Sequence, residues 1–118
     1  MLSSLNTSLS GLNTFQQQLS IAANNLANVN TDGFKQSQPV LESVNPLGVV
    51  ATSKKLELPG PLALEQSADG VSLVEKSNVD VSQEMASLIT AQRAYQTNLK
   101  ALKAADETVG SLLDVVGR

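Results

Sequence analysis

The sequence predicts a mainly α-helical protein, an elongated antiparallel coiled coil of N- and C-terminal helices with a small β-rich middle segment. Two patterns lead to this fold class. Apolar residues recur at alternating steps of three and four near both ends of the chain, which is the heptad pattern of packed helices. All four prolines lie between residues 39 and 61, where helix is disfavoured. The composition agrees, because 118 residues with two Phe, one Tyr and no Trp would build a thin aliphatic core.

Residues 1–31 are expected to form the N-terminal coiled-coil helix, with the helix itself over about residues 3–28. Its seam includes Leu2, Leu5, Leu9, Leu12, Gln16, Leu19, Ala23 and Leu26. No residue before Asp32 is charged, so this helix lacks the Glu–Lys pairs that stabilise isolated helices. Most of its stability should therefore come from packing against a partner.

Residues 32–79 are expected to form a loop and short β-strands. Asp32-Gly33 is a turn signal at the point where the first helix must stop. Composition and turn signals favour strands over residues 40–44, 48–53, 62–66 and 71–75, with a break at Pro59-Gly60-Pro61 and a hairpin turn at residues 67–70. Because this is too little for an independent sandwich, we expect a small β-element packed on the helices or on a neighbouring subunit.

Residues 80–118 are expected to form the long C-terminal coiled-coil helix, over about residues 81–116. Asp80 or Ser82 can accept a hydrogen bond from the first free amides, and Gln83 completes a capping-box pattern. At 1.5 Å per residue this helix would be about 54 Å long, more than a compact domain needs. Its seam consists of Val81, Met85, Leu88, Gln92, Tyr95, Leu99, Leu102, Asp106, Val109, Leu113 and Val116.

Three seam positions are polar, namely Gln16, Gln92 and Asp106. A polar seam residue can fix register or oligomer state at some cost in stability. Alternatively, the seam drifts and exposes these side chains, which we favour for Asp106 because it lies near the fraying end of the helix.

The residue types exclude much catalytic chemistry. Without Cys or His there is no disulfide, Cys nucleophile, His-dependent triad or usual catalytic zinc site. The adjacent carboxylates of Asp106 and Glu107 would point about 100° apart on a helix, too divergent to act on one bond. No glycine-rich phosphate loop occurs. We therefore expect neither an enzyme nor a cofactor, and no catalytic, cofactor-binding or metal residues.

The charge distribution argues against other classes of function. A net charge of −3 provides no basic face for nucleic acid. The N-terminus lacks the basic residues and unbroken apolar run of a secretory signal peptide, and no stretch approaches the roughly 20 apolar residues of a membrane-spanning helix. We expect no direct membrane insertion, and export, if it occurs, by a route that cleaves no ordinary signal.

The densest local pattern is the asparagine-rich segment from Ala23 to Lys35, which follows the first helix. Asn side chains bond to backbone groups, and several at a helix end can build a specific exit into a loop. Phe34 would anchor that exit in an apolar pocket. These residue types favour a structural joint over a small-molecule site.

This segment resembles the N-terminal signature of the bacterial flagellar axial proteins, the rod, hook and hook-associated family. The family's Ala-Asn-Asn-Leu-Ala-Asn core corresponds to residues 23–28, and its Thr-x-Gly-Phe-Lys to residues 31–35. Residues 77–81, with Glu84, Leu88-Ile89, residues 91–96 and Asn98, resemble the C-terminal signature. The two signatures and their helices cover about 70 of the 118 residues. The resemblance assigns an assembly motif to Asn24, Asn25, Leu26, Asn28, Thr31, Gly33, Phe34, Asn78, Asp80, Gln92, Arg93, Tyr95 and Asn98.

The resemblance implies a structural subunit of the flagellar basal-body rod. Such proteins are exported unfolded by the flagellar type III apparatus without cleavage, and polymerise helically around the export channel to transmit torque. The implied partners are copies of the chain, other rod and hook proteins, and the export apparatus, in a rod that spans the periplasm. The chain is similar in size to a proximal rod protein, whereas its motifs look closer to the distal rod and hook type. A non-catalytic coiled-coil binding module or secretion adaptor that shares these ends is the alternative.

Overall fold

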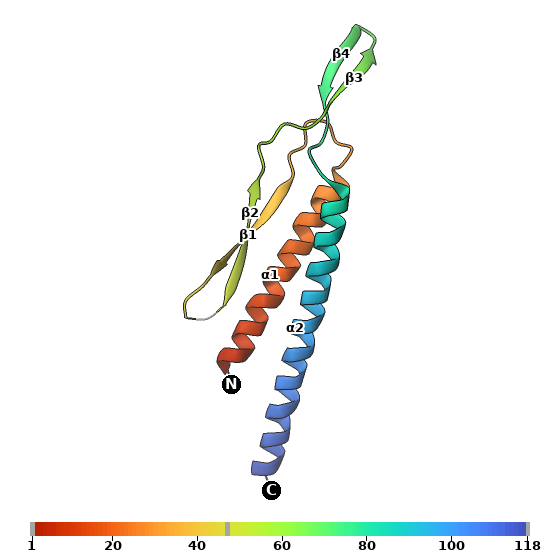
Figure 1. The fold of residues 1–118 in the computed structure, drawn as a ribbon. Coiled ribbons are helices and arrows are strands. Elements are labelled where there is room, and N and C mark those ends of the chain that lie inside the picture. The colour runs from red at the N-terminus through yellow and green to blue at the C-terminus, as the bar shows by residue number, and fades with distance from the viewer. Residues whose placement is uncertain (1, 47, 118) are drawn as a thin grey trace.

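The computed structural model describes residues 2–46 and 48–117, so Met1 and Arg118, the outer limits of the predicted terminal segments, lie outside the described residues. The fold is elongated, with extents of 82 × 24 × 19 Å. Its elements are α1 (Leu2–Ala27), β1 (Ser37–Ser43), β2 (Val49–Lys55), β3 (Leu62–Ser67), β4 (Gly70–Glu75) and α2 (Val81–Val116). Figure 1 shows that the chain goes up along α1, makes both hairpins, and returns down α2.

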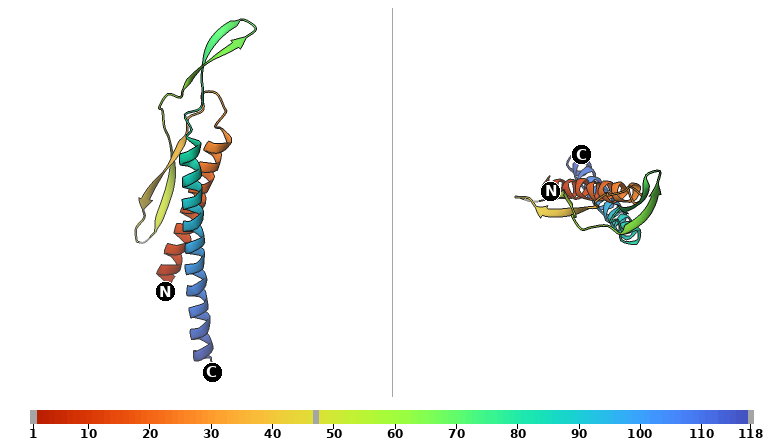
Figure 2. Two further views of the ribbon diagram at one scale, coloured as in Figure 1. Left: turned by 45° about the vertical axis from the view of Figure 1, so that its right-hand side comes forward. Right: turned by 90° about the horizontal axis from the view of Figure 1, so that it is seen from above.

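The two helices lie side by side and antiparallel, and α2 with 36 residues extends past the N-terminal end of α1 with 26 (Figures 1 and 2). The β1–β2 hairpin packs along α1, and the β3–β4 hairpin projects beyond the helix pair. Asp80 begins α2 as its N-cap, because its Oδ1 accepts hydrogen bonds from the amides of Ser82 and Gln83 at 2.9 and 3.2 Å. This decides between the two predicted capping residues.

The predicted fold class, a mainly helical coiled coil, is wrong. The structure is a helix–strand mix, about 54% helix and 23% strand, with the strands in two separate two-stranded antiparallel sheets. The middle segment forms regular hairpins because its turns close both ladders. One face of α1 contacts the first hairpin. Thr14 Oγ1 donates to the Val49 carbonyl at 3.0 Å, and the Val49 amide donates to Ser10 Oγ at 3.2 Å. This helix therefore divides its surface between α2 and a sheet.

The four strands overlap the predicted ones with shifted ends. In the first hairpin the register runs from Ser37 opposite Lys55 to Ser43 opposite Val49. In the second, Ser67 pairs with Gly70, whose φ of 125° only glycine adopts readily, so the tight turn lies within the predicted residues 67–70. The Pro59-Gly60-Pro61 segment lies between the hairpins, outside any strand.

The apolar core is thin. Its buried apolar side chains are Leu12, Ile21, Ala22, Ala51 and Ala91. Small residues allow the helices to approach closely: a Cβ added to Gly11 would lie only 2.2 Å from Asn98 Nδ2. The stripe of α2 that faces α1 accordingly follows Glu84, Leu88, Ala91, Tyr95, Asn98 and Leu102, which are buried or half-buried.

The predicted seam shares only part of this stripe. Of the predicted seam residues, Leu12 is buried. The half-buried seam residues are Leu5, Leu19, Leu26, Leu88, Tyr95, Leu102 and Val109. By contrast, Leu9, Met85, Leu99 and Leu113 are 52%, 52%, 48% and 68% exposed. Small side chains bring Asn98 against Gly11, while Leu99 lies at the edge of the helix contact, where it lines a groove with Leu5 and Leu9 of α1. The three polar seam positions, Gln16, Gln92 and Asp106, are exposed.

Candidate functional site

The candidate site is the joint, which we define as the region where α1 ends, β1 begins and α2 starts (residues 24–37, 56–60 and 75–80). Chain segments far apart in sequence meet there (Figure 1). Several of their contacts are hydrogen bonds between side-chain amides and backbone groups, so the joint is set by specific polar pairing as well as by apolar packing.

Asn25 is the one described residue whose side chain is large and fully buried, with no exposed area. Its Nδ2 donates to the Ser37 carbonyl at 2.7 Å, and its Oδ1 accepts from the Ser37 amide at 2.8 Å. The side-chain amide thus pairs with both backbone groups of Ser37, as a neighbouring strand would. This pairing ties the last turn of α1 to the first residue of β1.

Asn78 plays the corresponding part on the other side of the joint. Its Oδ1 accepts from the buried Gln36 amide at 2.6 Å, and its Nδ2 donates to the carbonyls of Leu56 and Leu58 at 3.2 and 2.9 Å. One amide therefore links the segment before β1, the segment after β2 and the approach to α2.

The loop after α1 is built by Asn28, Thr31 and Gly33. Asn28 Nδ2 donates to the Asn24 carbonyl at 2.9 Å, and Thr31 Oγ1 donates to Asn28 Oδ1 at 3.1 Å. Gly33 has a φ of 67°, in the left-handed region, and its amide donates to the Glu75 carbonyl at 2.8 Å. Phe34 is half-buried, and its carbonyl accepts a hydrogen bond from the backbone amide of Asn78 at 3.3 Å.

A charged cluster closes the joint toward the second hairpin. Glu75 Oε1 accepts from Lys35 Nζ and, at 2.7 Å, from the Gly60 amide. The hydrogen bond from Lys35 and then the one from Gly60 lower the pKa of Glu75 below its ordinary value of 4.5. A side chain at Gly60 would collide with the backbone, because an added Cβ would lie 2.0 Å from the Lys76 carbonyl oxygen.

Lys76 forms a second cluster beside the first. Its ammonium pairs with Asp32 at 2.7 Å and also with Glu65 of β3. These hydrogen bonds, first the one to Asp32, raise the pKa of Lys76 above 10.5. Because all three side chains are partly exposed, solvent screens the pairs, and they orient the second hairpin more than they stabilise the fold.

The structure divides the predicted motif residues into two groups. The joint holds Asn24, Asn25, Leu26, Asn28, Thr31, Gly33, Phe34, Asn78 and Asp80. The other four, Gln92, Arg93, Tyr95 and Asn98, lie further along α2. Of these, Gln92 and Arg93 are exposed, while Asn98 Nδ2 donates to the Ser8 carbonyl at 3.5 Å.

Several residues of the joint were not predicted as site residues. Glu75 and Gly60 carry no sequence signal beyond the Pro-Gly-Pro break, and Gln36 is bound through its backbone, which no side-chain pattern reveals. Glu84 is 6% exposed although it is charged. It lies in the recognised C-terminal signature, but a charge at a helix contact is not expected from hydrophobic periodicity.

The arrangement is suited to holding segments together. Within residues 2–46 and 48–117, no three Cys, His, Asp or Glu side chains gather in a way that could hold a metal ion. In the same part of the chain, neither helix has the length and hydropathy needed to cross a membrane.

Family models match the two segments that the fold brings together. The family described as "Flagella basal body rod protein" matches residues 5–35, and "Flagellar basal body rod FlgEFG protein C-terminal" matches residues 72–115. The chain belongs to the flagellar rod and hook protein family. These matches contain most of α1 with the loop after it, and most of β4 with nearly all of α2.

Individual flagellar rod and hook proteins agree with this membership. The flagellar hook protein FlgE of Salmonella typhimurium is 28% identical over 92% of this chain, and the flagellar basal-body rod protein FlgG of Borreliella burgdorferi is 32% identical over 57%. FlgG of Agrobacterium fabrum is 56% identical over 30% of the chain. The chain spans only 36%, 29% and 14% of these relatives.

Proposed function

We propose that this chain is a structural subunit of the flagellar basal-body rod that polymerises helically around the export channel. One observation carries this proposal: the two family-matched segments are the two that the joint locks together. In this arrangement the antiparallel helix pair forms the wall of the tube. The motif residues Asn25 and Asn78 fix how the remaining chain leaves that wall.

Unpaired apolar surface supports a role in assembly. Met85, Ile89 and Leu99 are 52%, 51% and 48% exposed on α2. Near the end of the same helix, Leu113 and Val116 are 68% and 82% exposed. Exposed apolar side chains in this number on one helix are typical of an interaction surface. Copies of the chain and other rod and hook proteins would cover these side chains, and the interlocked helices would transmit torque.

The N-terminal segment suits export by the flagellar type III apparatus in an unfolded state. Its uncharged first 31 residues carry no intrahelical ion pairs, and few of its apolar side chains are fully buried in the single chain. Such a helix gains much of its order from neighbours, and the entropy lost on ordering is then offset by contacts made on assembly. This would keep exported subunits from polymerising early.

Gene deletion with complementation tests the proposal. We expect the deletion strain to lose rods and swimming, and the wild-type gene to restore both. Complementation with Asn25→Ala should restore less swimming than complementation with Asn24→Ala, because only Asn25 pairs with Ser37. Intact rods and normal swimming in the deletion strain would contradict the proposal. A stable small cytoplasmic oligomer would favour the secretion adaptor instead.

A further inference from the structure

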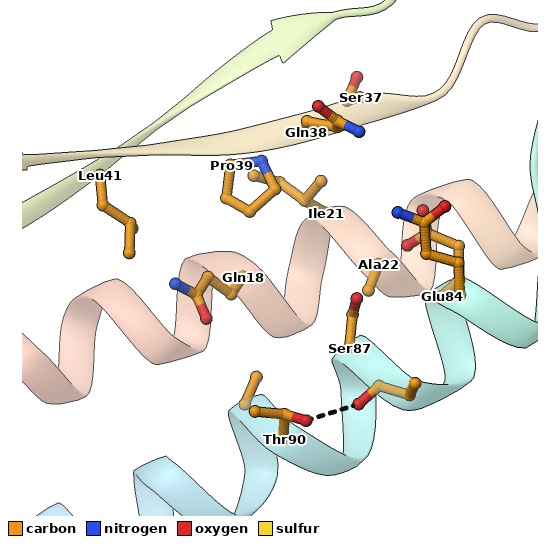
Figure 3. Close-up of a pocket in the computed structure, with 13 residues that line it drawn as sticks. Gln18, Ile21, Ala22, Ser37, Gln38, Pro39, Leu41, Glu84, Ser87 and Thr90 are labelled. Atoms are coloured by element: carbon orange, nitrogen blue, oxygen red, sulfur yellow. Dashed lines mark hydrogen bonds between the residues drawn. The ribbon is translucent and has the colours of Figure 1, made fainter.

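A cavity of about 430 Å³ lies between α1, β1 and the first turns of α2. Figure 3 shows Gln18 and Ala22 from α1, Gln38 and Pro39 from β1, and Ser87 and Thr90 from α2 around it. Of the described residues that line this cavity, Glu84 alone is charged. The cavity is therefore lined by both apolar and polar side chains and carries a single negative charge.

Glu84 has no partner in the described part of the chain. The residue is only 6% exposed, and no described side chain or amide forms a hydrogen bond or ion pair with its carboxylate. Among the described residues, every buried side-chain nitrogen or oxygen that solvent cannot reach has a hydrogen-bond partner. Because the Glu84 carboxylate has no such partner, its oxygens are accessible from the open cavity. A carboxylate that faces a cavity without a partner can pair with a cation that enters from outside.

Arg93 offers a complementary charge. It is exposed on α2, and its guanidinium forms no ion pair with any described residue. Arg93 follows Glu84 by nine positions, which at about 100° per residue places the two on opposite sides of the helix. They cannot meet within one chain, but they can meet between two chains that lie side by side.

We propose that Arg93 of one copy enters the Glu84 cavity of the next copy. The planar guanidinium suits this site, since it can pair with the carboxylate and also donate to the amide and hydroxyl oxygens of Gln18 and Ser87. The contact joins two different surfaces of identical chains, so it repeats without closing into a symmetric pair and builds rings or open helical assemblies. This inference rests on the proposed function and specifies one subunit contact within it.

Thiol cross-linking tests the contact. The chain has no cysteine, so Ser87→Cys marks the cavity, and Thr97→Cys marks the surface one turn beyond Arg93. We expect a short bismaleimide to join the two full-length variants when they are mixed, and to join neither variant to itself. Arg93→Gln in the Thr97→Cys chain should lower the yield about tenfold, as should Glu84→Gln in the Ser87→Cys chain. Combining both changes should lower it no further.

Matched controls use charges on the same helix that lie outside the cavity. Lys100→Gln and Glu107→Gln should leave the yield unchanged. Arg93 is exposed, so Arg93→Gln tests the pairing even if Glu84→Gln impairs folding. Cross-links within a single-variant sample, or an unchanged yield with Arg93→Gln, would overturn the pairing.

Incorporation of the wild-type chain into isolated rods, measured in parallel, separates the two proposals. Incorporation without the mixed cross-link overturns the Arg93–Glu84 contact and leaves the proposed function standing. The absence of both incorporation and cross-link overturns both.

Discussion

The side-chain amide of Asn25 pairs with both backbone groups of Ser37, at 2.7 Å from Nδ2 to the carbonyl and 2.8 Å from the amide to Oδ1. Asn presents its donor and its acceptor on two separate atoms of one planar amide, whereas Gln carries the same amide on a longer stem and an ionised Asp has no donor. The pairing connects the end of a helix to the start of a strand.

Replacing Asn25 with Ala should therefore destabilise the fold. The change leaves the carbonyl and the amide of Ser37 without their partner, at a cost of about 2 kcal/mol. Urea unfolding followed by circular dichroism measures that cost, and hydrogen exchange should show a faster Ser37 amide. Asn24→Ala, at an exposed neighbouring position, should change the unfolding free energy by less than about 0.5 kcal/mol. Equal effects of the two variants would show that the Ser37 pairing contributes nothing.

Acid should weaken the joint through Glu75. Because its folded pKa lies below the ordinary 4.5, the stability that it contributes is present above about pH 4.5 and is lost as pH falls through the lowered pKa. Glu75→Gln should therefore be less stable than wild type at pH 7, and the difference should close toward pH 3. Urea midpoints across this range measure it. Glu57→Gln, which changes an exposed carboxylate in the same part of the chain, is the matched control at pH 7 and should leave the urea midpoint there unchanged.

Two glycines should respond to alanine in opposite directions. Gly60→Ala places a Cβ 2.0 Å from the Lys76 carbonyl oxygen and should destabilise the fold by about 1–3 kcal/mol. Gly110 lies within α2, and a Cβ there would meet nothing within 4 Å. Gly110→Ala should therefore stabilise the helix by about 0.5–1 kcal/mol. Thermal unfolding of both variants tests this, and a stabilising Gly60→Ala would mean that the close backbone approach is absent.

Aspartate at Leu99 and at Ala91 should separate assembly from folding. Leu99 is 48% exposed, so Leu99→Asp should lower the unfolding free energy by less than about 1 kcal/mol while it blocks incorporation into rods. Ala91 is 3% exposed, so Ala91→Asp buries a charge and should cost more than about 3 kcal/mol. Gln96→Asp adds a similar charge at an exposed polar position and should affect neither property. Normal incorporation of Leu99→Asp would show that this face of α2 is free in the rod.

The positions of the helices follow from local signals in the sequence. The predicted helices, about residues 3–28 and 81–116, lie within one residue of α1 and α2 at each end. The periodic apolar residues mark these helices, and Asp80 marks the start of α2. The strands also overlap their predictions, since turn residues such as Gly70 act locally.

The contact stripe of α2 could not be predicted in the same way. Two heptad stripes on this helix share Leu88, Tyr95 and Leu102 but differ at the positions between them. Hydrophobicity favours Leu99 over Asn98, whereas Asn98 is half-buried against Gly11 and Leu99 is 48% exposed at the edge of the contact. The periodicity of the sequence shows where apolar residues recur. The distance between two packed helices depends instead on the size of the side chains on both of them.

The joint was predicted as a region, and its bonding was not predictable. The asparagine-rich segment indicated a structural exit from α1. Asn25 binds the backbone of Ser37, and Asn78 binds the backbone amide of Gln36. These backbone groups come within reach of the two side chains only in the complete fold, so the sequence alone does not reveal the pairing. The helix–strand class was also missed, because short strands contribute little to a composition dominated by two long helical patterns.

A reconstruction of isolated flagellar basal bodies, with mass spectrometry of the same sample, tests directly whether this chain is a rod subunit. We expect this chain to be present as a repeated rod subunit, with α1 and α2 side by side in the wall of the tube and the joint at the outer end of the pair. Its absence from basal bodies of a strain that makes the protein and assembles complete rods would show that the chain is not a rod subunit.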